Sequence, residues 1–452
     1  MNDNPQNIDT KINFSSNSFK KYFVNTSWLF TEKIFRLLLS FIVTVLVIRY
    51  LGPEEFGLLS YAISFYGLFS AFSILGLESI TIRELVKNPN RKDELLGSVF
   101  LLRLVGGGVT IIIIGLTLYL SNETPSTSLL IIIVSTSVIF QSFNVIDYYF
   151  RAEVKAKYSV YVQSSSVLIT SLIKLLLVIL KAPLIYFAGV FSAEFVFAAI
   201  GFIFVYNRFD LKISIGKFRT DLARKLLKDS WPLILSSVMV SIYAKVDQVM
   251  IKNILNTEQV GYYASAVKLC EAWYFIPIAL TNSLFPAIVN AKQVSKEFYN
   301  NRMQKLYDIL AWMAIAIAVP ISFFSKEIIN IIFGIEFQSG AIVLAIYIWG
   351  GVAVFLGVAS NQYLINENFT KLSFLRTFIG MIINVGLNFL LIPIYGIIGA
   401  AIATLISYSI ATISLIFSKR SFHQVAMILK SIFFITLLQY LLNPWQSRLG
   451  KK

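Results

Sequence analysis

Residues 37–48 read LLLSFIVTVLVI, an apolar run without a charged side chain. An α-helix rises about 1.5 Å per residue, so it needs roughly 20 apolar residues to cross a hydrocarbon core about 30 Å thick. Comparable runs recur from residue 28 to residue 442, and hydrophobic residues make up 57% of the 452-residue chain. A soluble protein cannot hide that much apolar surface. The sequence therefore predicts an all-α, polytopic membrane protein.

Twelve membrane spans are expected, followed by a C-terminal hydrophobic segment. The expected spans are 28–50, 57–82, 95–120, 127–150, 158–180, 184–206, 231–255, 259–290, 305–332, 341–365, 371–394 and 397–418, and the last segment is 424–442. Loops after odd-numbered spans are nearly free of Lys and Arg, whereas most loops after even-numbered spans are basic. Because basic loops stay in the cytoplasm, we expect the N-terminus and the end of the twelfth span to lie inside.

The charged, cysteine and histidine residues exclude several classes of protein. The formal net charge is +15, from 39 Lys and Arg against 24 Asp and Glu, but the basic residues gather in the loops between spans. Membrane topology accounts for that distribution, so nucleic acid is not an expected partner. One cysteine, Cys270, excludes an intramolecular disulfide and a cysteine-built metal site, and the one histidine, His423, lies beyond the twelfth span. No P-loop, zinc-protease or serine-hydrolase motif is present, so we expect no catalytic residue, metal site or bound cofactor.

The chain divides into two halves of six spans each. The expected parts are a cytoplasmic tail (1–27), a first six-helix lobe (28–206), a basic cytoplasmic linker (207–230), a second six-helix lobe (231–420) and a C-terminal hydrophobic segment with its tail (421–452). Residues 51–62 and 255–266 share Leu, Glu, Gly and Ala at the same offset, each between the first and second spans of a half. Repeats with an even number of spans are parallel, and a transported substrate then binds between the two lobes.

Charged residues inside the spans are the candidate site, because charge at membrane depth is costly and usually faces the interior of the bundle. The cationic candidates for a substrate cavity are Arg36, Arg103, Lys174, Lys245 and Lys268, and the candidates for coupling to a proton or sodium ion are Asp247, Glu271 and Glu78. Local ion pairing is an alternative for Lys268 and Glu271, which are three residues apart on one helical face. Asn384 and Asn388 share a face of the eleventh span, where hydrogen bonding between helices is expected.

Residues 49–61, RYLGPEEFGLLSY, resemble the polysaccharide-biosynthesis family of oligosaccharide flippases, the Wzx-type exporters of O-antigen and related repeat units. That family belongs to the multidrug/oligosaccharidyl-lipid/polysaccharide (MOP) superfamily. Three further segments fit it, namely residues 246–251 with 260–268, the run from Pro277 to Pro286, and residues 384–401. The resemblance covers nearly the whole chain.

The resemblance implies a MATE-like arrangement of two lobes around a cavity that opens alternately to each side of the membrane. It implies a transporter rather than an enzyme, located in the bacterial plasma (inner) membrane. Its substrate would be an undecaprenyl-diphosphate-linked oligosaccharide, moved from the cytoplasmic to the outer leaflet for O-antigen or capsule-like synthesis, with other polysaccharide-assembly proteins as partners. Family members often have twelve or fourteen spans, so segment 424–442 is expected to lie in the interface or to cross incompletely.

Three other functions are weighed against this one. A cation-coupled multidrug exporter of the same superfamily should have an acidic cavity, whereas Lys and Arg at least match Asp and Glu inside these spans. A membrane glycan polymerase or acyltransferase needs a catalytic loop or histidine, and the sequence has neither. Nothing in the sequence favours a channel.

Overall fold

The computed structural model describes residues 16–121, 123–209, 217–418 and 421–442. All elements in these residues are helical. The first half contains α1 (Ser16–Ile74), α2 (Leu77–Lys87), α3 (Lys92–Leu120), α4 (Pro125–Ser135), α5 (Ser137–Phe140), α6 (Val145–Ala152), α7 (Ala156–Ile179) and α8 (Leu184–Asn207), with 3₁₀ turns η1 (Pro89–Arg91) and η2 (Gln141–Asn144). The second half contains α9 (Thr220–Ile254), α10 (Thr257–Glu271), α11 (Phe275–Ala291), α12 (Lys296–Phe323), α13 (Ser325–Ile332), η4 (Ile335–Gly340), α14 (Ala341–Asn366), α15 (Thr370–Ile413), η5 (Ser414–Phe417), α16 (Phe422–Ile432) and α17 (Ile435–Leu442).

Two glycines divide the longest helical stretches into pairs of membrane spans. Ten apolar stretches are long enough to cross a bilayer, and the longest two contain 54 and 48 residues. As straight helices these two would measure about 80 and 70 Å, more than twice the hydrocarbon thickness. Each instead turns back at a glycine with positive φ, Gly52 (φ 69°) in α1 and Gly396 (φ 59°) in α15. A side chain at either glycine would strain the turn. Because two of the ten stretches each contain two spans, the structure has twelve spans, in agreement with the sequence prediction.

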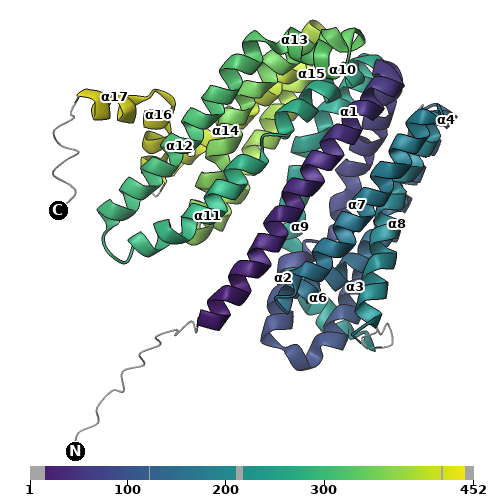
Figure 1. The fold of residues 1–452 in the computed structure, drawn as a ribbon, viewed down its shortest axis with the longest axis horizontal. Helices are drawn as coiled ribbons and strands as arrows, with labels where there is room; N and C mark the ends of the chain where they lie inside the picture. The colour runs from purple at the N-terminus through teal and green to yellow at the C-terminus, as the bar shows by residue number, and fades with distance from the viewer. Residues whose placement is uncertain (1–15, 122, 210–216, 419–420, 443–452) are drawn as a thin grey trace, which may run out of the picture.

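The spans form two lobes that meet along α1, α9 and α10 (Figure 1). Helices α3, α4, α7 and α8 pack against α1 in the first lobe, and α11 to α15 belong to the second lobe. The most extensive contacts between the lobes join α1 to α9 and α10. The all-α, two-lobe fold predicted from the sequence is therefore confirmed.

The two lobes touch at the positions that the sequence repeat singles out. A Cβ atom on Gly57 would lie 1.8 Å from the carbonyl oxygen of Thr257, and one on Gly261 would lie 1.9 Å from the carbonyl oxygen of Pro53. The two contacts are reciprocal. Gly57 meets the carbonyl four residues before Gly261, and Gly261 meets the carbonyl four residues before Gly57. Small residues allow helix backbones in membranes to approach this closely. The repeat therefore forms a nearly symmetric contact between the lobes.

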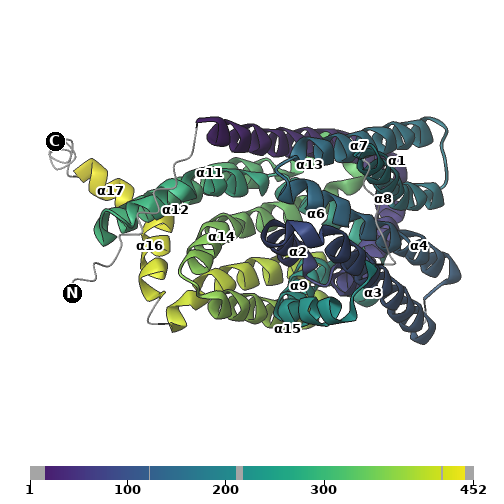
Figure 2. The ribbon, with the colours of Figure 1, turned by 90° about the horizontal axis from the view of Figure 1, so that it is seen from below.

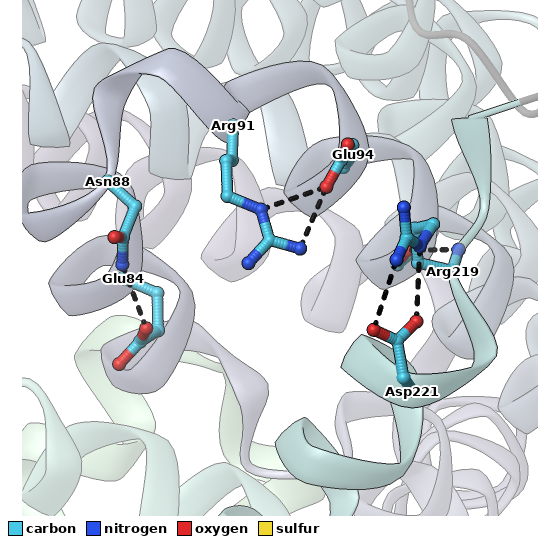
Figure 3. Close-up of polar contacts among 7 residues, drawn as sticks. Glu84, Asn88, Arg91, Glu94, Arg219 and Asp221 are labelled. Carbon is cyan, nitrogen blue, oxygen red and sulfur yellow. Dashed lines mark hydrogen bonds and ion pairs between the residues drawn. The ribbon is translucent and has the colours of Figure 1, made fainter.

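Helix α9 is also attached to the first lobe at its N-terminal end (Figure 3). The backbone N–H of Arg219 donates to Ser98 Oγ at 3.2 Å, and the Arg219 guanidinium donates to both carboxylate oxygens of Asp221. Lys217 Nζ pairs with Asp93 at 2.6 Å. Residues 220–230, expected as linker, are helical, so α9 begins well before the predicted span.

Two other segments differ from the expected spans. The eighth span is interrupted between α10 and α11, because Pro277 lacks the N–H that would bond to the Trp273 carbonyl. The predicted ninth span, 305–332, is wrong at its end, since α12 stops at Phe323 and Ser325–Ile332 forms a separate helix.

The C-terminal hydrophobic segment forms two short helices, α16 and α17, beside α12 (Figure 2). Their 11 and 8 residues reach only about 17 and 12 Å, too short to cross a bilayer. Buried Asp308 holds the bend between them, because Ser431 and Thr436 donate to its Oδ1 at 2.6 and 2.9 Å.

We predict that Gly57→Ala and Gly261→Ala each lower the midpoint of thermal unfolding in detergent by several degrees. The new Cβ overlaps a backbone carbonyl, so the helices must separate, and overpacking of this kind costs about 1–3 kcal/mol. Gly115→Ala and Gly386→Ala are matched controls, because no atom lies within 4 Å of their added Cβ. Equal midpoints for all four variants would contradict the proposed close contact.

Candidate substrate cavity

Three of the predicted cationic residues come together between the lobes. Lys174 on α7, Lys245 on α9 and Lys268 on α10 are close enough for the first two charges to repel the third. Lys174 pairs with Glu194 at 3.9 Å, and Glu271 attracts Lys268. We call this group the lysine cluster. It contains three ammonium groups and two carboxylates, those of Glu194 and Glu271, so its net charge is positive.

Lys268 faces a space between the lobes. Its side chain is exposed, although Val267 and Leu269 on either side of it are buried. A cavity of about 210 Å³ lies between α1 and α10 and is lined by Lys268, Glu271 and side chains of α1, which are apolar except for Ser40 and Thr44. An ammonium group at this depth is therefore accessible to a bound molecule.

A larger cavity lies inside the second lobe, between α9, α14 and α15. Its volume is about 1260 Å³, and most of its wall is apolar. Arg376 and Lys371 are its basic residues, and Glu271 and Tyr274 line it at the break in the eighth span. Because Glu271 also lines the smaller cavity, the two spaces adjoin at this carboxylate. We call the larger space the second-lobe cavity.

The other cationic candidates and Glu78 lie away from the lysine cluster. Arg36 donates to Gln163 Oε1 at 3.1 Å and so joins α1 to α7. Arg103 is 2% exposed and donates to the Tyr148 hydroxyl at 2.5 Å. Glu78 pairs with Arg151 at 2.5 Å, and Asp147 lies 3.6 Å from the same guanidinium. Arg103 is thus buried inside the first lobe, whereas Glu78 and Arg151 form a partly exposed ion pair of that lobe.

Asp247 lies at the centre of a buried hydrogen-bond network in the second lobe. Its carboxylate accepts hydrogen bonds from Tyr263 (2.7 Å), Thr404 (2.7 Å) and Asn388 (2.6 Å). Asn388 also donates to Asn384 Oδ1 at 3.2 Å, while its own Oδ1 is buried without a partner. The predicted hydrogen bonding of the two asparagines between helices is confirmed. The partner is the Asp247 carboxylate on α9, which is far from both asparagines in the sequence.

At the end of the molecule where α1 turns at Gly52, an ion pair joins the lobes. Lys252 on α9 lies 2.5 Å from Glu123 in the α3–α4 connection, and the Tyr61 hydroxyl donates to the same carboxylate at 2.6 Å. The Lys252 ammonium lies 4.9 Å from the centre of the Tyr61 ring. Nearby, Arg49 of the first lobe donates to the carbonyls of Ile331 and Ile332 in the second. These contacts close this end, whereas the second-lobe cavity extends toward the opposite end of α9, α14 and α15.

Sequence reasoning did not identify Glu123, Lys252 or Arg49 as partners. A signal was available, since Glu123 is the one charged residue of loop 121–126. Lys252 lies near the end of the expected span 231–255, next to the loop 256–258, which contains no Lys or Arg. An isolated acid and an isolated base at the same predicted membrane face could have been paired.

Comparison with known proteins identifies the family. The sequence profile described as "Polysaccharide biosynthesis protein" matches residues 23–292, more than half of the chain. The protein belongs to the polysaccharide biosynthesis family. This membership confirms the resemblance read from residues 49–61.

Two curated relatives align with this family member. One is "Probable low-salt glycan biosynthesis flippase Agl15" of Haloferax volcanii, 28% identical over 42% of this chain and 41% of that protein. The other is "Capsular polysaccharide biosynthesis protein CapF" of Staphylococcus aureus, 22% identical over 88% of this chain and 99% of CapF. The aligned region thus spans less than half the length of Agl15 and nearly all of CapF.

Two solved structures share the fold of this family member. "Lipid II flippase MurJ, inward closed conformation" has a TM-score of 0.68 at 18% identity, covering 92% of this chain and 93% of MurJ. A "multidrug resistance MATE family transporter of the MOP superfamily" in an inward-facing conformation has a TM-score of 0.65 at 15% identity, covering 89% and 95%. The protein is therefore a multi-pass membrane protein with the transporter fold of that superfamily.

We predict that Glu123→Gln separates the lobes at the Gly52 end. Breaking a buried ion pair costs up to about 3–5 kcal/mol, and less here because Lys252 is partly exposed. Spin labels on cysteines introduced at the exposed positions Ser126 and Ile335 should show a shift to longer distances. The charge-reversed pair Glu123→Lys with Lys252→Glu should keep the original distance. An unchanged distribution in Glu123→Gln would contradict a closing role for this pair.

Proposed function

We propose that this protein is a flippase for lipid-linked oligosaccharides in surface polysaccharide synthesis. The substrate would be an undecaprenyl-diphosphate-linked repeat unit, moved from the cytoplasmic to the outer leaflet of the bacterial plasma membrane. The observation that carries the proposal is the net-positive lysine cluster between two lobes of a transporter fold. Family membership supports the glycan as cargo.

The lysine cluster suits a diphosphate in both charge and place. Hydrocarbon excludes phosphate charges, so a polar passage must offset the lost hydration. Lys268, Lys245 and Lys174 supply flexible point charges, which bind phosphate without demanding one geometry. The small cavity beside Lys268 is lined on its other side by Leu37, Phe41 and other apolar side chains of α1. A polyprenyl tail could therefore remain in lipid near α1 while the diphosphate meets the lysines.

The geometry supports alternating access as the transport mechanism. With the N-terminus in the cytoplasm, the Gly52 end is the outer end, and the Glu123–Lys252 pair and the contact of Gly57 with Gly261 close it. The second-lobe cavity then extends toward the cytoplasm. The break between α10 and α11 at Pro277 lies beside Lys268 and Glu271, where a change of helix direction would move residues of both cavities.

Export has two available driving forces. Outward movement of negative charge gains about 2.3 kcal/mol per elementary charge per 100 mV when the cell interior is negative. Asp247 is the stronger candidate for coupling to a proton or sodium ion, because its carboxylate is buried and the hydroxyl oxygens of Tyr263 and Thr404 contact it. Glu271 is the second candidate, since it borders both cavities. Glu78 is set aside because Arg151 already neutralises it.

The alternatives from the sequence fit less well. A multidrug exporter shares the fold, but organic cations would meet a net-positive cluster between the lobes. A glycan polymerase or acyltransferase is a different class of protein, and the fold shared with solved transporters favours transport over either. We therefore retain a non-enzymatic transporter, which would work beside other polysaccharide-assembly proteins.

We predict that Lys268→Gln and Lys245→Gln each reduce export about tenfold or more, because a hydrogen bond to a charged group contributes about 1.5–3 kcal/mol. Deletion of the gene should cause a complete lipid-linked repeat unit to accumulate on the inner leaflet. The activity of each variant is then measured as the amount of surface polysaccharide that it restores in the deletion strain. Lys225→Gln, at an exposed position on α9, is the control. Full export by both cavity variants at normal membrane abundance would remove the lysine assignment, and absence of any accumulated lipid-linked glycan would remove the function.

We predict that Asp247→Asn abolishes stimulation of transport by an imposed sodium or proton gradient while binding of the lipid-linked glycan persists. The amide keeps the side-chain shape but removes the charge that holds a cation. Transport into the outer leaflet of proteoliposomes, with each gradient imposed in turn, measures this. Asp308→Asn, which alters a buried carboxylate outside the cavities, should keep its gradient response. Gradient-driven transport by Asp247→Asn equal to that of the unmodified protein would refute the coupling role.

A further inference from the structure

The second-lobe cavity contains a guanidinium group that the lysine cluster does not include. Arg376 lies near the start of α15, lines the cavity and is partly exposed to it. Its Nη1 donates to Ser360 Oγ at 2.6 Å and its Nη2 to the Gly357 carbonyl at 3.2 Å. Both acceptors are uncharged groups of α14. Arg376 is therefore held in one orientation without being neutralised.

Arg376 differs in this respect from several basic residues inside the described spans. Arg103 also bonds to a neutral group, the Tyr148 hydroxyl, but Arg103 is buried, whereas Arg376 lines a cavity. Carboxylates accompany Lys174, Arg151 and Lys252 as ion pairs. Within the part of the chain that the structure describes, no acidic group lies within ion-pair distance of Arg376, and the titratable groups that act on its charge are Tyr307 and Tyr243. A charge deep in a membrane protein is costly without a counter-ion. The missing counter-charge points to an anionic ligand.

The position of the cavity indicates which part of a substrate would reach Arg376. Glu271 lines both the small cavity beside Lys268 and the second-lobe cavity, so the two spaces adjoin at this residue. A diphosphate at the lysines would therefore direct its glycan past Glu271 into this space. The volume of about 1260 Å³ exceeds the roughly 300–1,000 Å³ typical of small-molecule sites.

The wall of the cavity suits a sugar chain. Tyr243, Tyr274, Tyr408 and Trp231 provide aromatic surface. Asn361 accepts a hydrogen bond from Ser373 at 2.6 Å, and both residues line the cavity near Arg376. A mainly apolar wall with a few oriented polar groups is typical of a ligand site.

We propose that the second-lobe cavity binds the glycan, and that Arg376 binds an anionic substituent on one of its sugars. This inference rests on the proposed flippase function. A carboxylate is the best match for the fixed guanidinium, because the two groups can form parallel hydrogen bonds. The transported repeat unit therefore contains an acidic sugar, such as a uronic acid.

The first test analyses the lipid-linked glycan that accumulates when the gene is deleted. Mass spectrometry should find an acidic sugar in addition to the diphosphate. A fully neutral glycan would overturn the Arg376 proposal and leave the flippase function standing. Absence of an accumulated lipid-linked glycan would instead remove the flippase function and the inference with it.

The second test measures ligand binding to the purified full-length protein. The probes are a disaccharide containing glucuronic acid, its neutral glucose counterpart and inorganic pyrophosphate, each titrated in a thermal-stability assay. We expect Arg376→Gln to weaken binding of the acidic disaccharide about tenfold, as for loss of one charge-assisted contact, without affecting pyrophosphate. Arg376→Lys should retain part of the affinity because it keeps the charge.

Matched variants separate the two anion sites. Lys268→Gln should weaken pyrophosphate but not the acidic disaccharide, and Arg224→Gln, at an exposed position on α9, should change neither. Equal affinity of the unmodified protein for the acidic and neutral disaccharides would overturn the proposal. Loss of pyrophosphate binding in Arg376→Gln would also overturn it, because Arg376 would then be part of the diphosphate site.

Discussion

The close backbone contact of α1 with α10 sets the geometry on which the other features depend. Gly57 and Gly261 lie directly against carbonyl groups of the opposite helix, so the lobes meet where neither has a side chain to separate them. The contact places the first two spans of one lobe against the first two spans of the other. From this point the helices extend toward the opposite end, where the second-lobe cavity lies. The same contact places α10, with Lys268 and Glu271 in its last turn, next to α1.

The charged residues inside the protein fall into groups with different chemistry. In the first lobe, Arg151 is neutralised by Glu78 and Asp147, which stabilises the packing of α2 against α6. In the second lobe, Asp247 is surrounded by hydroxyl and amide donors, so its carboxylate can remain buried without a basic partner. Between the lobes, the lysine cluster retains excess positive charge. The lysine cluster and Arg376 both border cavities, where an anionic substrate could neutralise their charge.

The predictions from the sequence succeeded for features that depend on local composition. Twelve spans and two halves follow from apolar length and loop charge, and these properties do not depend on tertiary contacts. The prediction for residues 305–332 was wrong, because apolar character continues through α13 although the chain changes direction after Phe323. Among the site candidates, the sequence could not separate Arg103 from Lys268, since both are basic residues within spans. Burial distinguishes them, and burial depends on which helices pack together.

The sequence by itself determined that the protein crosses the membrane many times, has two halves that share a short motif and belongs to its family, because apolar length, charge distribution and local motifs are properties of the chain. The tertiary structure alone decided which charges face a cavity. It brought Glu123 to Lys252, polar side chains of α10 and α15 to Asp247, and Lys174 and Lys245 to Lys268. It also left Arg376 beside a cavity without an acidic partner. The physical reason is that an ion pair or a hydrogen bond requires two groups within a few ångströms, and helices that lie far apart in the sequence acquire that proximity only by packing.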